Sequence, residues 1–397
     1  MIKNILKMIF LITFSIFAFS QDYQSVINQI LENNKQIKVI EEQLNGIYLE
    51  SKINSLPLNP EIEYSYLKNN KLNNGDKQEF LFSLPFEFPT IYSIKSEISA
   101  LQNSVNKLKL KEFKKKVILN TYNLLTEITY KRKIMLQLIS RIEDYENIYN
   151  AVKIQFEKSE IGILEFNKAK SLFLTYKAKL NYVIIEVKSL ETALIELNGG
   201  KEIKFISLEY PIKELPINFD SILVVLKEKD FVNKAFEEEI NLQSNKVSVA
   251  KLGWLPSFSL GYRYENEPEF NYSGLQFSLS IPLFENQNKV PKQESEKTLI
   301  KLQQQTYLTE FEIEKKKLIE SASLWKKLID EQRDIIDDEH FKLTKKSFEA
   351  GNISLTQYFI DNSIYYETTD SILEAEYNFH KAINALMIEL FANSYMQ

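Results

Sequence analysis

The amino-acid sequence predicts a mainly α-helical protein with a small β part, in which long coiled-coil hairpins are joined to four β-strands. Three observations lead to this prediction. The ten prolines are confined to a few short segments, the residues in those segments alternate between apolar and polar, and both features occur twice along the chain.

The first 20 residues have the three parts of a secretory signal peptide. Two lysines precede an apolar run from Met8 to Phe19, and Ala18 and Ser20 are the small residues of a cleavage site. A membrane anchor is the alternative, but a run of about 12 residues is shorter than the ~20 that span a bilayer. We therefore expect residues 1–20 to be removed during export and the mature protein to begin at Gln21.

Two proline-free stretches are predicted to form long helices. Residues 102–210 and 292–397 contain no proline and are rich in Leu, Ile, Lys, Glu and Gln, so helices can run through them without interruption. Between Ile134 and Val152 the apolar residues recur at spacings of three and four, while charged residues such as Arg141 are expected on the other faces. An unbroken helix over residues 90–155 would be roughly 100 Å long.

Four shorter segments alternate in the manner of β-strands and are predicted to form two hairpins, at about 59–87 and 256–284. Runs of about ten residues match tilted transmembrane strands, although two soluble hairpins with one buried face would show the same alternation. The aromatic residues on one face and the export signal favour the membrane. The expected lipid-facing residues are Ile62, Tyr64, Tyr66, Phe80, Phe82, Leu84, Phe258, Leu260, Tyr262, Tyr264, Phe277, Leu279 and Ile281.

Aromatic residues near the strand ends are candidates for a girdle at the membrane surfaces. They are Trp254, which lies two residues before Pro256, and the tyrosines 262, 264 and 272. Packing within the hairpins is the alternative role for these rings.

The second half of the chain repeats the first at a nearly constant offset, which predicts two copies of one unit. We expect the copies at 21–200 and 220–397, with a linker at 201–219. Each copy would contain a helix, a β-hairpin and a long helical hairpin, the last at about 90–197 or 290–392. The matching landmarks are Pro60 with Pro256, Pro85 with Pro282, Phe156-Glu157 with Phe348-Glu349, and Ile195-Glu196-Leu197 with Ile388-Glu389-Leu390.

The composition argues against an enzyme or a nucleic-acid-binding protein. Asp and Glu outnumber Lys and Arg by 54 to 49, cysteine is absent, and the only two histidines are His340 and His380. No phosphate-binding glycine loop or GxSxG sequence occurs. The acidic run near Asp330 is interleaved with lysines, as on a solvated helix face. We expect no catalytic residues, no cofactor, no metal site and no nucleic-acid partner.

Four strands cannot close a membrane barrel, because at least eight are needed and an open edge in lipid leaves backbone groups unpaired. If the strands cross a membrane, several copies of the chain must therefore assemble.

Together these features resemble the TolC-like outer-membrane efflux family, over essentially the whole mature chain. Local similarities lie at Glu32-Asn33-Asn34-Lys35-Gln36-Ile37, at Leu255-Pro256 and at Phe348–Ser354. The resemblance implies a homotrimer in the outer membrane, whose twelve strands form one barrel that continues as a helical tunnel into the periplasm. It also implies a passive conduit for small molecules or metal ions. A periplasmic adaptor and an inner-membrane pump, of the proton-driven resistance-nodulation-division type, would complete the system.

The resemblance also assigns roles to residues at the helical turns. The tips that would dock the adaptor are Ser159, Glu160, Ile161, Gly162, Gly351, Asn352, Ile353 and Ser354. The candidates for a periplasmic gate are Glu165, Gln357 and Asp361. A plain helical turn with no partner is the alternative for the tips, and solvated polar residues near a helix end are the alternative for the gate. A periplasmic adaptor or coiled-coil scaffold is the alternative function.

Overall fold

The computed structural model describes residues 23–70, 75–211, 219–333 and 338–396. The predicted signal peptide and residues 212–218 of the predicted linker lie outside the described residues. Contacts divide the chain into two compact units. The sheet unit comprises Val39–Glu112 and Asp230–Glu310, and the helical unit comprises Met1–Lys38, Phe113–Lys229 and Phe311–Gln397.

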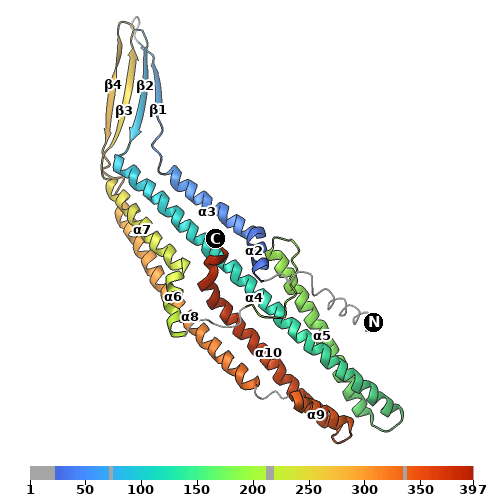
Figure 1. The fold of residues 1–397 in the computed structure, drawn as a ribbon. Coiled ribbons are helices and arrows are strands. Elements are labelled where there is room, and N and C mark those ends of the chain that lie inside the picture. The colour runs from blue at the N-terminus through green and yellow to red at the C-terminus, as the bar shows by residue number, and fades with distance from the viewer. Residues whose placement is uncertain (1–22, 71–74, 212–218, 334–337, 397) are drawn as a thin grey trace. The chain divides into compact units, whose positions relative to one another are not determined.

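Helices dominate the fold, and one four-stranded sheet accompanies them (Figure 1). The helices are α2 (Tyr23–Asn33), α3 (Lys35–Ile53), α4 (Pro89–Glu157), α5 (Ile163–Leu197), α6 (Phe219–Lys229), α7 (Phe231–Leu252), α8 (Lys289–Arg333), α9 (Asp338–Glu349), α10 (Leu355–Phe391) and the 3₁₀ turn η1 (Ala392–Tyr395). The strands are β1 (Glu61–Leu67), β2 (Lys77–Phe86), β3 (Ser257–Asn266) and β4 (Asn271–Ser280). None of the described helices has an apolar stretch long enough to cross a bilayer.

The sheet is antiparallel throughout, with the strands in the order β1-β2-β3-β4. The central pair, β2 and β3, joins a hairpin from the first half of the chain to one from the second half. Ile62, Phe82, Tyr262 and Leu275 lie in one row across the four strands. Because side chains alternate along each strand, this register puts most of the apolar residues of the four strands on the same face, while Leu67, Leu81 and Tyr272 lie on the other.

Helix α4 is one continuous helix of 69 residues, as expected from its lack of internal proline. Pro89 occupies its first position, where the missing N–H costs nothing. The corresponding stretch of the second half was also expected to run without interruption. In that stretch α8 ends at Arg333 and α9 begins at Asp338, and residues 334–337 between them lie outside the described residues.

The core of the helical unit lies where α4 packs against α10. Ile118, Leu125, Ile128, Ile383 and Leu386 are fully buried. A second cluster contains Leu138, Tyr145, Ile148 and Val152, the stripe expected from the sequence, together with residues of α5 and α10. Burial of these side chains supplies most of the stabilisation, since the surfaces of long helices carry mainly charged residues.

Arg141 was expected on a solvated face, and this expectation was wrong. Its side chain is only 3% exposed and forms two hydrogen bonds with the Asp370 carboxylate, at 2.8 and 2.7 Å. The guanidinium carbon also lies 4.4 Å from the ring centre of Tyr366. A carboxylate and an aromatic face together compensate the charge, which allows it to be buried.

Candidate functional sites on the sheet and the helical turns

One face of the sheet is apolar and open to the surroundings. Twelve of the thirteen residues expected to face lipid lie within the strands on this face, and all but Phe258 are exposed. Phe258 is half-buried because it packs against Phe86, Phe88 and Phe277, with ring centres 5.5 to 5.8 Å apart. The expected residue that lies outside the strands is Ile281. It follows the last residue of β4, because Pro282 cannot donate to a strand ladder.

Leu275 also belongs to the apolar face, although it is not among the thirteen residues expected there. It lies opposite Tyr262 and is 84% exposed. Gly274 and Ser273 precede it and obscure the alternation at the start of β4. A strict two-residue count back from Phe277 would have found it.

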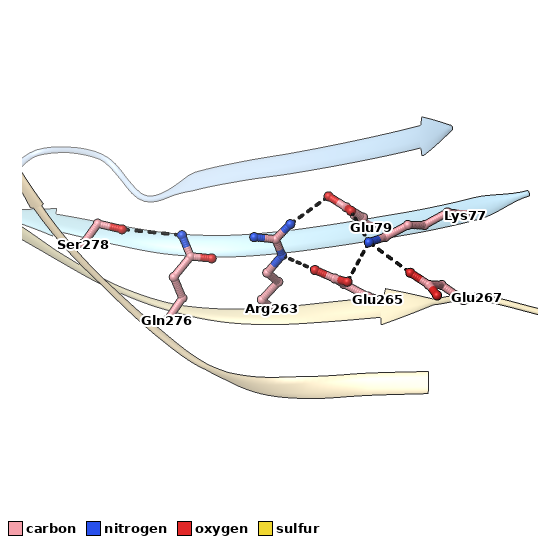
Figure 2. A network of polar contacts seen from close by, with 7 residues as sticks. All are labelled: Lys77, Glu79, Arg263, Glu265, Glu267, Gln276 and Ser278. Atoms are coloured by element: carbon pink, nitrogen blue, oxygen red, sulfur yellow. Dashed lines mark hydrogen bonds and ion pairs between the residues drawn. The ribbon is translucent and has the colours of Figure 1, made fainter. Parts of the chain in front are cut away.

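The opposite face of the sheet carries a ladder of ion pairs across β2 and β3 (Figure 2). Lys77 Nζ lies 2.8 Å from Glu79, 2.7 Å from Glu265 and 3.2 Å from Glu267. Arg263 lies 3.0 Å from Glu79 and 2.6 Å from Glu265. Two cations therefore bridge three carboxylates at the join between the two halves of the chain.

The remaining strand positions on this polar face are mostly small or uncharged. Gln276 donates to Ser278 at 3.4 Å (Figure 2). On β1, the polar face carries Glu61 and Glu63, both exposed. With the three carboxylates of the ladder, this face has five acidic groups against two basic ones, so its net charge is negative.

The outer edges of the sheet are open among the described residues. β1 pairs only with β2, and β4 pairs only with β3. The backbone groups along these edges are therefore available to pair with another strand.

The two predicted tips are turns of the same construction. At the first, Ser159 N–H donates to Phe156 O and Glu160 N–H to Gln155 O, both at 2.9 Å. At the second, Gly351 N–H donates to Phe348 O and Asn352 N–H to Ser347 O, also at 2.9 Å. This pair of bonds is the Schellman ending of a helix.

The predicted tip residues divide into an exposed and a half-buried group. Ser159, Glu160, Gly162, Gly351, Asn352 and Ser354 are exposed. Ile161 and Ile353 are half-buried and pack against the cluster around Tyr145. The isoleucines hold the turns against the helices, so the surface available to a partner is formed by the polar residues.

The local sequence pattern does not single out an apolar residue that lies beside the first tip. Leu164, in the first turn of α5, is 81% exposed. At the second tip the residue 192 positions further along is Thr356, which is polar. Ile163, which is adjacent to Leu164, is 51% exposed, so the first turn of α5 presents two neighbouring apolar side chains beside the tip.

Two of the gate candidates occupy the third position of a helix. Glu165 accepts a hydrogen bond from Gly162 N–H at 3.2 Å, which closes the first turn of α5. Gln357 N–H donates to Ser354 Oγ at 3.2 Å, and its side chain donates to Asp361 at 2.8 Å. Each candidate thus has a local structural role at the start of a helix.

A buried aromatic cluster is formed by residues of α4, α5 and α10. Tyr145 stacks on Tyr176 at 4.8 Å, and both rings lie 6.2 Å from Tyr366. Burial raises the pKa of the Tyr145 and Tyr366 hydroxyls above the ordinary value. No group of three His, Cys, Asp or Glu residues in the described chain is arranged to hold a metal ion.

Comparison with known proteins gives matches in structure but not in sequence. No protein-family model and no curated protein sequence matches the chain. The outer-membrane channel CmeC of Campylobacter jejuni superposes with a TM-score of 0.74 and 16% identity, over 93% of this chain and 85% of that one. CusC, from a study of folding and transmembrane channel formation, superposes with a TM-score of 0.74 and 15% identity, over 93% of this chain and 91% of that one.

A membrane protein from Pseudomonas aeruginosa gives a TM-score of 0.78 at 12% identity, over 93% of this chain and 89% of that one. Such identities establish a common fold and leave the activity to be argued from the residues. The chain therefore has the fold of solved outer-membrane channels, as the sequence resemblance to the TolC-like family predicted.

Proposed function

We propose that the protein is the outer-membrane channel of a tripartite efflux system, and that it acts as a passive trimer. The observation that carries this proposal is the four-stranded sheet with one exposed apolar face and two open edges. In water such a face and such edges would aggregate, whereas lipid can cover the face and neighbouring copies can pair the edges.

Three copies would supply twelve strands, an even number within the range of closed membrane barrels. The edges β1 and β4 would pair between copies, the apolar face would contact outer-membrane lipid, and the polar face would line a water-filled lumen. The fold shared with CmeC and CusC supports this arrangement. The two sequence repeats at 21–200 and 220–397 would each contribute one hairpin to the wall.

The helical turns would meet the rest of the system in the periplasm. We propose that the exposed residues at the two tips dock a periplasmic adaptor, with Leu164 as the apolar contact of the first tip. An inner-membrane pump of the resistance-nodulation-division type would supply the energy, and the cargo would be small molecules or metal ions. Glu165, Gln357 and Asp361 are proposed to narrow the tunnel there, in addition to their local hydrogen bonds.

The assembly is tested by electron microscopy of the protein purified in detergent from the outer-membrane fraction. We expect a three-fold particle with a narrow tail on the order of 100 Å, the length of a helix with as many residues as α4. A monomer that is released from membranes by salt or alkali would refute the channel and favour a periplasmic adaptor or scaffold.

The docking role is tested by Leu164→Ser, with Leu174→Ser as a control. Leu174 lies on the same helix and is 50% exposed. We expect Leu164→Ser to weaken adaptor binding and export while leaving unfolding unchanged, because an exposed leucine contributes little to stability. Equal losses in both variants would mean that the tip has no special role.

A further inference from the structure

Four helices of the sheet unit line a cavity of about 730 Å³. Helices α3 and α4 come from the first half of the chain, and α7 and α8 come from the second half. Each helix contributes residues that are mostly three or four positions apart, so one face of each helix borders the same space. The volume lies within the range of roughly 300–1,000 Å³ that is typical of sites for small organic molecules.

Contacts between the helices hold the walls of this cavity in place. Ser51 Oγ lies 3.0 Å from a serine hydroxyl of α4 and joins α3 to that helix. The buried amide of Gln243 donates to Gln293 Oε1 at 2.7 Å and joins α7 to α8. Lys109 lies 2.5 Å from Glu239 and joins α4 to α7. The chain itself therefore forms the walls, and a ligand is not needed to assemble them.

The lining of the cavity has an excess of positive charge. Its two carboxylates and four lysines are Glu50, Glu296, Lys95, Lys246, Lys289 and Lys292. Lys246 has no ion-pair partner among the described residues. Lys289 and Lys292 pair with carboxylates one helical turn away, at 3.4 and 3.7 Å, but these pairs are exposed and such pairs contribute little. Three ammonium groups of the lining are therefore available to an anion.

The cavity also offers apolar surface. Its lining includes Ile47, Ile98, Val249 and Ala250, and the alkyl stems of the lysines add to them. The charge is opposite to that of the polar face of the sheet, so it changes sign between the strands and the helices of this unit. A matching ligand would have an apolar body and an acidic group.

We propose that this cavity is a binding site for a small organic anion with an apolar body, such as an aromatic sulfonate or carboxylate. The lysine ammonium groups would hold the acidic group through charge-assisted hydrogen bonds, and the aliphatic side chains would cover the apolar body. The inference goes beyond the proposed channel. All of the lining residues belong to one chain, so the site does not depend on how copies of the chain assemble.

Equilibrium dialysis tests the proposal, with the purified full chain in phosphatidylcholine nanodiscs and naphthalenesulfonate as the probe. Naphthalenesulfonamide is the neutral control ligand, and nanodiscs without protein measure the uptake by lipid. We expect one sulfonate to bind per chain and to bind more tightly than the sulfonamide. Added salt should weaken the binding of the sulfonate and leave that of the sulfonamide unchanged, because salt screens exposed charges.

Two pairs of variants locate the site. Lys246→Gln removes a cation from the cavity, and Lys251→Gln, on the same helix but outside the lining, is its control. Ile47→Ser removes an apolar contact, and Ile53→Ser, also in α3, is its control. Ile47 is 45% and Ile53 66% exposed, so we expect both serine variants to fold.

We expect the dissociation constant of the sulfonate to rise roughly three- to tenfold in Lys246→Gln and in Ile47→Ser, and to stay the same in both controls. Lys246→Gln should leave the binding of the sulfonamide unchanged. The inference is wrong if the folded wild-type chain takes up no sulfonate, or if the sulfonate and the sulfonamide bind equally well. Equal losses in each variant and its control would likewise show that the anion binds elsewhere.

Discussion

Ser159 and Gly351 adopt the same left-handed backbone conformation, with φ of 63° and 75°, at the C-terminal ends of α4 and α9. Glycine reaches this region without cost, whereas a residue with a Cβ is strained there by about 1 kcal/mol or more. The two turns are built alike, yet one of them carries a residue that does not suit its conformation.

We expect Ser159→Gly to raise the free energy of unfolding by about 1 kcal/mol, and Gly351→Ser to lower it by a similar amount. Denaturant titration of the helical circular dichroism signal measures both changes. Gly162→Ser is the control, because Gly162 has φ of −83° and no atom lies within 4 Å of the position of an added Cβ. Similar losses from Gly162→Ser and Gly351→Ser would contradict the explanation by backbone strain.

The buried pair of Arg141 and Asp370 predicts a second stability effect. Asp370→Asn leaves a guanidinium that is 3% exposed without its counter-charge. We expect the free energy of unfolding to fall by about 2–3 kcal/mol. This is at or below the lower end of the range for breaking a buried ion pair, because Asp370 itself is 45% exposed. Replacing both residues, as Arg141→Met with Asp370→Leu, should restore most of this loss in thermal unfolding. If the double variant is as unstable as the single one, the loss of stability in Asp370→Asn does not come from breaking the ion pair.

Glu389 gives the protein a sensitivity to acid. It lies 2.7 Å from Lys115 and 3.1 Å from Lys315, and all three side chains are nearly buried. Burial by itself would raise the pKa of the Glu389 carboxyl, but the two lysines outweigh burial and hold the pKa below its usual value. The carboxylate therefore stabilises the folded state above the ordinary glutamate pKa of about 4.3, and this stabilisation is lost as the pH falls toward the lower folded value.

Glu389→Gln should lower the melting temperature at neutral pH by removing a buried partner of two lysines, at a cost of about 3–5 kcal/mol. The difference from the wild type should shrink below pH ~4, because protonation removes the same charge. Melting curves of both proteins from neutral to acidic pH measure this. A constant difference at every pH would show that Glu389 is not the titrating group.

The ion-pair ladder of the sheet predicts a preference for cations in the proposed lumen. The polar face carries five carboxylates and two cations per chain, and rings of acidic residues favour cations. Lys77→Gln should increase the cation preference and Glu79→Gln should decrease it, as measured by reversal potentials of the protein in planar bilayers under a salt gradient. Channels whose reversal potential stays the same in both variants would place selectivity elsewhere.

The sequence predicts the two faces of the sheet well, because strand alternation depends only on neighbouring residues. Ile281 lies just beyond the sheet for a local reason, since Pro282 ends the ladder before the alternation ends. The sheet order is a different matter, because the pairing of β2 with β3 joins residues such as Glu79 and Glu265 that are far apart in the sequence. Local alternation does not predict which strands pair over such a distance.

Arg141 shows the same limit in the helices. It follows Leu138 by three residues and precedes Tyr145 by four, so its spacing is that of the buried stripe and its charge argues for the surface. Only Asp370 and Tyr366, more than 220 residues away, decide between the two. The positions of the two turns can be predicted, because a turn has local signals in the sequence. Sequence spacing, however, cannot separate a residue that caps a helix, such as Glu165, from one that lines a tunnel.

The unbroken course of α4 constrains how this gene can change. Deleting or inserting one codon anywhere within its 69 residues would rotate every later side chain of the helix by about 100°. Arg141, Tyr145 and the rest of the buried stripe would then leave their partners together. Related genes should therefore differ in length at the hairpin loops and near residues 201–211, while the number of codons for α4 stays fixed or changes by whole helical repeats.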